Sequence, residues 1–127
     1  MRRQGKIRSI AVMTDTDTRD LLDRFNAAWG EHDLDTALAL CTDDCVFEST
    51  GPAPDGERHE GKDAVRAAWK PIFDDTRASF ETEDAFSAGD RYVQLWRYGW
   101  GDGHVRGVDV IRLRDGKVSE KFSYVKG

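Results

Sequence analysis

One carboxylate in this sequence, that of Asp109, falls on the apolar side of an expected strand. Side chains alternate over residues 107–113, and Asp109 has the same parity as Ile111. Carboxylates are rarely buried unless they are paired or used for function. An acid in an apolar pocket is harder to ionise than in water, and it can donate or accept a proton near neutral pH. Asp109 is therefore our candidate catalytic acid or base, and the alternative is a structural ion pair with Arg97 or Lys121.

Other side chains would have to complete such a site. Arg97 is our second candidate catalytic residue, because a guanidinium can hold an oxyanion or alter the acidity of a nearby carboxyl. Lys121 and Ser123 share a parity on the last strand and are expected to reach the same cavity. His59 is expected at the cavity mouth, where the alternative is an exposed loop histidine. The apolar walls are expected to come from four aromatic residues of the helices, Phe25, Trp29, Trp69 and Phe73.

The sequence has no signature of a metal or cofactor site. Its three histidines are far apart, and none forms an HxH or HxxxH pair. Cys41 and Cys45 form a C-x3-C pair without a second Cys or His pair nearby, which is a poor zinc signature. There is also no glycine-rich phosphate-binding loop. We therefore expect no metal and no cofactor, and we expect both cysteines to be reduced, buried thiols.

The N-terminal part of the chain is typical of helices that pack on a sheet. Capping residues at 14–18 precede a helical stripe of apolar side chains, Leu21, Leu22, Phe25, Ala28 and Trp29. Asp33 then caps a second, shorter helix. A third helix is expected from Lys62 to about Asp75, after a Pro/Gly loop over 51–56.

Strands are expected over 45–49 and through most of the C-terminal part. Four further segments alternate and are separated by glycine-containing turns, namely 79–86, 91–100, 105–114 and 117–125. Helices followed by an antiparallel meander predict an α+β domain whose helices pack on one face of a curved sheet.

The strand expected over 91–100 carries bulky apolar groups on both sides. Its aromatic side chains share one side, Tyr92, Trp96, Tyr98 and Trp100. Helices cover only one side of such a sheet, so a second apolar side needs a partner. We expect a homodimer packed through the aromatic side, and the alternative is that these residues line a ligand cavity.

Length and composition limit the number of domains and the kinds of partner that we expect. A chain of 127 residues with 39% hydrophobic and 34% charged residues predicts one globular domain. We place it at residues 18–127, behind a basic extension over 1–17. The net charge of −5 argues against nucleic-acid binding. No apolar run approaches the roughly 18 residues that span a bilayer, so we expect no membrane partner, and the lack of a secretory signal favours the cytoplasm.

Two sequence motifs accompany this order of helices and strands. They are Gly-Lys-Asp-Ala-Val at 61–65, where the third helix starts, and Gly-Val-Asp-Val-Ile-Arg-Leu-Arg-Asp-Gly-Lys-Val at 107–118, near the end of the chain. With them the chain resembles the SnoaL-like branch of the nuclear transport factor 2-like superfamily over about residues 18–125. The resemblance implies a cone-shaped α+β fold, shared with ketosteroid isomerases and limonene epoxide hydrolases. Its curved sheet, mixed or antiparallel, wraps around the N-terminal helices.

The resemblance also implies roles for single residues. Asp109 matches the acid that donates a hydrogen bond to the oxyanion in ketosteroid isomerases, and it is the counterpart of the pocket aspartate of SnoaL-like cyclases. The isomerase tyrosine falls on Phe25 and the isomerase general base falls on Ser49. Arg97 matches the arginine of the epoxide hydrolases, whose two aspartates fall on Gly99 and Ser123.

These matches lead to two hypotheses about function. The first is a cofactor-free acid/base enzyme of isomerase, cyclase or lyase type, which acts beside a carbonyl of a small apolar organic ligand through Asp109. The second is a non-catalytic ligand-binding or dimerisation module of the same fold. The second is favoured by the residues that depart from the family patterns, Phe25, Ser49, Gly99 and Ser123.

Overall fold

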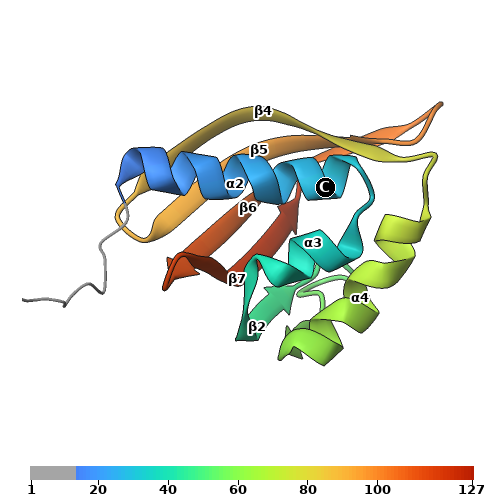
Figure 1. The fold of residues 1–127 in the computed structure, drawn as a ribbon. Helices are drawn as coiled ribbons and strands as arrows, with labels where there is room; N and C mark the ends of the chain where they lie inside the picture. The colour runs from blue at the N-terminus through green and yellow to red at the C-terminus, as the bar shows by residue number, and fades with distance from the viewer. Residues whose placement is uncertain (1–13) are drawn as a thin grey trace, which may run out of the picture.

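The computed structural model describes residues 14–127 of the chain (Figure 1). Thr14 caps the first helix, because its hydroxyl accepts from the Asp17 amide over 3.0 Å while the Asp17 carboxylate accepts from the Thr14 amide over 3.3 Å. The helix therefore begins at Asp15, ahead of the boundary that we expected at residue 18. Residues 1–13 of the expected basic extension lie outside the described residues.

Apart from one short extra strand, the helices and strands follow the order that the sequence predicted. In chain order they are α2 (Asp15–Gly30), α3 (Leu34–Ala39), β2 (Cys41–Glu48), β3 (Arg58–Glu60), α4 (Lys62–Asp74), β4 (Ser79–Ala88), β5 (Arg91–Gly99), β6 (His104–Arg114) and β7 (Lys117–Val125). None of the helices within residues 14–127 has the length and apolar character that crossing a membrane requires.

The strands form a six-stranded sheet in the order β3-β2-β7-β6-β5-β4. Only β2 and β7 pair in parallel, while the other neighbours pair antiparallel, so the sheet is mixed. Figure 1 shows that the sheet curves, with α2 lying along its concave side and α4 beside β2. The predicted α+β fold with a curved sheet around N-terminal helices is confirmed.

Two strands differ from the expectation. β2 begins at Cys41, ahead of the strand that we expected at 45–49, because Cys41 pairs with Val118 of β7 before an irregularity in the ladder. β3 was not expected, since its three residues, Arg58–Glu60, have no apolar alternation. It is an edge strand that pairs with β2, where His59 lies opposite Phe47.

The aromatic side of β5 faces the inside of the molecule. Tyr92 is 9% exposed and Trp96 5% exposed, and Tyr92 belongs to the same core cluster as Leu21 and Phe25 of α2. A homodimer packed through this side is therefore wrong, because the chain's own helices cover it. Of these aromatic residues, Trp96 and Tyr98 line cavities, and binding of a ligand there stays a prediction.

The opposite side of the sheet carries the exposed apolar groups. Phe86 lies opposite Val93, and Tyr124 lies opposite Val108, so both share the outer side with Leu95. Phe86, Leu95 and Tyr124 are exposed large hydrophobic residues. We call this side of the sheet the outer face.

Candidate functional site

Asp109 lies in the middle of the concave side of the sheet and is 3% exposed. Antiparallel pairing sets it opposite Gln94 of β5 and opposite Ser123 of β7. The Ser123 hydroxyl donates to Asp109 Oδ1 over 2.7 Å, and the Gln94 amide donates to Oδ2 over 3.0 Å. A buried carboxylate held by donors on both oxygens is oriented and keeps its charge at a lower cost.

Two more side chains extend this arrangement. Lys121 Nζ donates to Ser123 Oγ over 2.9 Å and lies 3.5 Å from Asp109 Oδ1. Asn26 of α2 donates through Nδ2 to Gln94 Oε1 over 2.8 Å. A continuous chain of hydrogen bonds thus joins α2, β5, β6 and β7, and we call these five residues, Asn26, Gln94, Asp109, Lys121 and Ser123, the carboxylate cluster.

Lys121 is 6% exposed, which is unusual for a lysine. Its Nζ lies 4.8 Å from the centre of the Trp29 ring and 5.1 Å from the centre of the Phe47 ring. Ring faces attract a cation at such distances, and they stabilise it where water is excluded. The sequence placed Lys121 in the cavity, and the aromatic rings with Asp109 explain how a cation is held there.

Arg97 does not join the carboxylate cluster. Gln94, opposite Asp109, is on the concave side, and Arg97 has the other parity on the same strand. Arg97 lies opposite Glu81 of β4 and Arg106 of β6 on the outer side of the sheet. The expected catalytic role of Arg97 beside Asp109 is therefore wrong, and Lys121 is the cation that accompanies the carboxylate.

Two neighbouring cavities open beside the cluster. The smaller, of about 40 Å³, touches Asp109, Gln94 and Asn26. The larger, of about 240 Å³, touches Ser123 and Lys121 and reaches Tyr98 and Ser49. They lie next to each other because they share part of their walls, Trp29, Phe80, Trp96 and Lys121. Ligand pockets usually start at roughly 300 Å³, so this space suits a compact ligand.

The aromatic walls differ in part from the expectation. Trp29 lines both cavities, as expected. Phe25, Trp69 and Phe73 do not line either one; they pack around Trp29, with ring centroids 6.3, 5.0 and 4.4 Å from its own. They fix the position of the Trp29 ring from behind. Phe80 completes the wall opposite, because its ring meets Trp29 edge-on at 5.4 Å.

His59 lies beside the larger cavity, on its outer side. Its ring stacks on Phe47 at a centroid distance of 5.9 Å, and Nε2 is 3.9 Å from Glu57 Oε1. It lines an open groove of about 560 Å³ along α4, and this groove shares Phe47, Ser49 and Ile72 with the larger cavity. His59 therefore lies in a groove that adjoins the larger cavity rather than next to Asp109, and its place at the cavity mouth stays a prediction.

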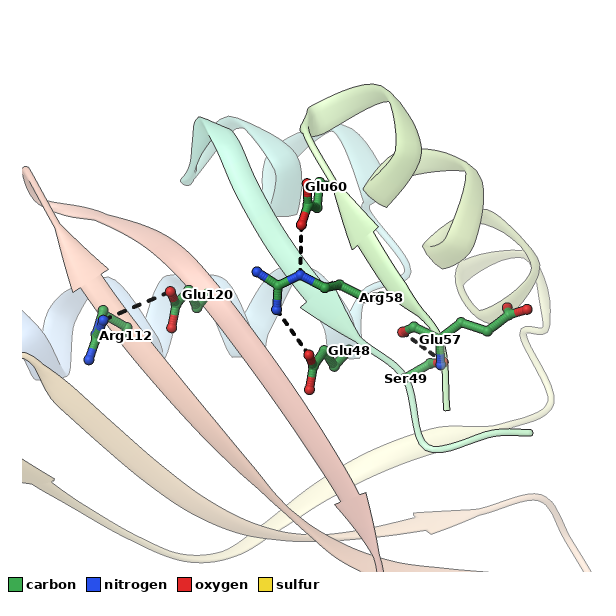
Figure 2. A network of polar contacts seen from close by, with 7 residues as sticks. All are labelled: Glu48, Ser49, Glu57, Arg58, Glu60, Arg112 and Glu120. Carbon is green, nitrogen blue, oxygen red and sulfur yellow. Dashed lines mark hydrogen bonds and ion pairs between the residues drawn. The ribbon is translucent and has the colours of Figure 1, made fainter. Parts of the chain in front are cut away.

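Polar contacts hold β3 beside this groove (Figure 2). Arg58 lies between Glu48 and Glu60, at 3.0 and 2.7 Å from their carboxylates. Ser49 Oγ accepts from the Glu57 amide over 3.0 Å and donates to the Gly51 carbonyl over 2.7 Å. Ser49, which the resemblance matched to the isomerase general base, thus hydrogen-bonds to the local backbone.

The burial of Tyr98 affects its chemistry. Desolvation, and secondarily the charge of Asp75, raise the pKa of the Tyr98 phenol. It therefore stays protonated at neutral pH and is a hydrogen-bond donor in the wall of the larger cavity. Within residues 14–127, no group of three or more His, Cys, Asp or Glu side chains is placed to hold a metal ion.

Asn26 and Gln94 are the members of the cluster that sequence reasoning missed. Gln94 had a weak signal, since it is a polar residue between Tyr92 and Trp96 on the buried side of its strand. Asn26 had none, because nothing in the helix pattern shows that it meets a glutamine of a distant strand.

A family model for the SnoaL-like domain matches residues 22–121. This chain belongs to the SnoaL-like family. The matched residues include Asn26, Gln94, Asp109 and Lys121 of the carboxylate cluster, and the resemblance first drawn from the motifs at 61–65 and 107–118 is confirmed. No curated protein matches the chain.

Solved structures agree with the family. An NTF2-like protein of unknown function from Mesorhizobium loti is 41% identical, with a TM-score of 0.81, over 88% of this chain and 93% of that one. An NTF-2 like protein of unknown function from Burkholderia xenovorans is 20% identical, with a TM-score of 0.75, over 88% and 84% of the chains. A computationally designed 17-OHP binder is 25% identical, with a TM-score of 0.73, over 87% and 91%.

Proposed function

We propose that this SnoaL-like protein binds a compact, largely apolar organic ligand with a carbonyl group in the larger cavity, and that Asp109 moves a proton on it without a cofactor. The observation that carries the proposal is Ser123, whose hydroxyl lines the larger cavity and donates to Asp109 over 2.7 Å. The carboxylate is thereby linked to the ligand space although the protein buries it. The designed 17-OHP binder supports the use of such a cavity for an organic ligand.

In the proposed reaction Ser123, Asp109 and Lys121 have separate roles. A proton from the carbon beside the carbonyl would pass to Ser123 Oγ while the Ser123 proton passes to Asp109. The Lys121 ammonium, which lines both cavities, would stabilise the enolate oxygen that forms. This is the chemistry of an isomerase, a cyclase or a lyase that acts next to a carbonyl.

Two indole groups favour a ligand that carries a hydrogen-bond acceptor. Trp29 Nε1 and Trp96 Nε1 are buried and have no hydrogen-bond partner among residues 14–127. Both residues line both cavities. A buried donor without a partner costs about 1–3 kcal/mol, and a ligand oxygen in this space would remove that cost.

The test is proton exchange on a bound ketone in D₂O. A panel of small cyclic and aryl ketones is screened for binding by native mass spectrometry, and exchange at the carbon beside the carbonyl is followed by NMR. Asp109→Asn should slow exchange by about 10²–10⁴-fold, with affinity within about tenfold of the unmodified protein. Asp20→Asn, an exposed position on α2, is the matched control. Normal exchange in Asp109→Asn would refute the role of Asp109.

A second candidate, a non-catalytic binding module, is favoured by one observation. Gln94, Ser123 and Lys121 already surround the Asp109 carboxylate. In such a module the cluster would only stabilise the sheet. The ketones would then bind without exchange in the unmodified protein, and Asp109→Asn would lower the free energy of unfolding without any effect on exchange.

We also propose that the outer face forms a homodimer. A groove of about 310 Å³ on this face is lined by Leu95, Val108 and Tyr124, beside an ion pair of Arg106 with Glu83 at 2.9 Å. A two-fold dimer needs a self-complementary surface, and a patch with apolar groups and both charges meets that requirement. The cytoplasmic location stays a prediction.

A further inference from the structure

Lys121 differs from the other lysines of the described chain in its surroundings. Its side chain is 8% exposed, whereas the side chains of Lys62 and Lys70 are 30% and 64% exposed. Lys117 and Lys126 are exposed as well. Lys121 is therefore the one buried primary amine within residues 14–127, and it lies in the wall of both cavities.

A lysine in an apolar pocket is a nucleophile for carbonyl groups. An amine attacks a carbonyl carbon in its neutral form, and pocket lysines form Schiff bases with aldehydes and ketones when a nearby base takes a proton from them. Around Lys121 Nζ the rings of Trp29 and Phe47 take the place of solvent at 4.8 and 5.1 Å. The hydroxyl of Ser123 at 2.9 Å connects the amine to the Asp109 carboxylate.

We propose that Lys121 forms an imine with the aldehyde or ketone group of the ligand in the larger cavity. This inference rests on the proposed function, because it requires that the cavity binds a carbonyl compound. It goes further by making the bond covalent, so that the protonated imine on Lys121 takes over from the ammonium in stabilising negative charge when the neighbouring carbon loses a proton. It also narrows the ligand to a carbonyl that an amine can attack, which excludes carboxylic acids and simple amides.

The protons and the bonds of this step balance within the cluster. Asp109 takes one proton from the Lys121 ammonium through the Ser123 hydroxyl, which leaves a neutral amine. The Nζ lone pair forms a bond to the carbonyl carbon, and a nitrogen proton moves to the oxygen to give a carbinolamine. Asp109 then returns its proton to the hydroxyl, the carbon–oxygen bond breaks, and water leaves. The product is a protonated imine, with no oxidant or reductant consumed.

The aromatic walls fit this chemistry. Trp29, Phe47, Phe80 and Trp96 surround the ligand space and limit the entry of water, which would hydrolyse an imine. The volume of about 240 Å³ matches a single or fused aromatic ring that carries an aldehyde. Benzaldehyde and 2-naphthaldehyde are therefore suitable probes.

The experiment traps the imine by reduction. The full chain is incubated with either aldehyde and sodium cyanoborohydride, and intact mass and peptide mapping locate the adduct. We expect a mass gain equal to the aldehyde less one oxygen atom, located on Lys121 in at least tenfold excess over Lys70. Lys121→Met should lose this adduct, and Lys70→Met, changed at an exposed position, should keep it. Since peptide mapping is done on the unmodified chain, it shows whether Lys121 forms the imine even if Lys121→Met folds poorly.

A second measurement separates this inference from the proposed function. 2-Naphthylmethanol cannot form an imine, and its binding is measured by native mass spectrometry without reductant. If it binds and protects Lys121 from trapping, both proposals are supported. If it binds while adducts form only on exposed lysines or on the terminal amine, the imine is refuted and the pocket remains. If neither it nor any ketone binds, both proposals are refuted.

Discussion

The Asp109 carboxylate and the Lys121 ammonium lie 3.5 Å apart on neighbouring strands, and both are almost fully buried. Ser123 Oγ bridges them, because it accepts from Lys121 over 2.9 Å and donates to Asp109 over 2.7 Å. A buried ion pair is a weak source of stability by itself, since desolvation offsets the attraction of the charges. Its position beside two cavities is what makes it a candidate site.

Removing one charge of this pair should destabilise the protein strongly. Lys121→Met leaves the Asp109 carboxylate buried without its cation, and we expect a loss of about 3–5 kcal/mol in the free energy of unfolding. Urea denaturation followed by tryptophan fluorescence measures it. The double variant with Asp109→Asn should lose less than the sum of the single losses. Strict additivity would contradict the coupling of the two residues.

Ser123→Ala should separate chemistry from stability. It removes the hydroxyl that links Asp109 to the larger cavity. We expect exchange on a bound ketone to fall by about 10²-fold, while the affinity for the ketone stays within about tenfold. The same NMR assay in D₂O measures it. An unchanged exchange rate would show that protons reach Asp109 by another path.

The Trp96 ring lies against Gly107, in space that a side chain at position 107 would otherwise fill. An added Cβ would collide with the Tyr124 carbonyl and with the Trp96 ring, both of them neighbours in the sheet. Gly107→Ala should therefore cost about 1–3 kcal/mol in stability through overpacking, and it should weaken ligand binding by displacing Trp96. Gly30→Ala, where a Cβ meets nothing within 4 Å, is the control and should be neutral or slightly stabilising. Equal melting temperatures for both variants would contradict this account.

The outer face is tested by sedimentation. Leu95→Asp places a charge in the apolar groove of this face and should shift a dimer to monomer at micromolar concentration. Ala67→Asp on α4, an exposed position away from the outer face, should leave the assembly unchanged. A monomer in the unmodified protein would refute the dimer.

The two cysteines should differ in reactivity. Both are free and buried, but the interaction between the two thiols lowers the pKa of Cys45, while the same interaction together with burial raises the pKa of Cys41. Cys45 therefore has more thiolate at a given pH, and its alkylation by iodoacetamide should rise at lower pH than that of Cys41. Mass spectrometry of partly labelled protein measures this order. Faster labelling of Cys41 would contradict it.

The sequence by itself determined the elements and the faces of single strands. The stripe of α2, the helix that begins at Lys62 and the alternation over 107–113 depend on local periods of 3.6 and 2 residues. These periods require no knowledge of distant contacts. They were enough to predict the α+β fold and the buried position of Asp109, because an apolar strand face must be covered.

Only the tertiary structure decided which faces meet. Alternation divides a strand into two sides, but the pairing register sets which side of β5 adjoins Asp109, and that register brings Gln94 to it instead of Arg97. The same holds for Asn26 and Gln94, which are 68 residues apart and meet because α2 crosses the concave side of the sheet. The lining of a cavity likewise depends on how several helices and strands pack together. Phe25, Trp69 and Phe73 therefore pack against Trp29 and do not line the larger cavity. The local sequence determines the period of each helix and strand, whereas long-range packing determines which side chains meet in the candidate site.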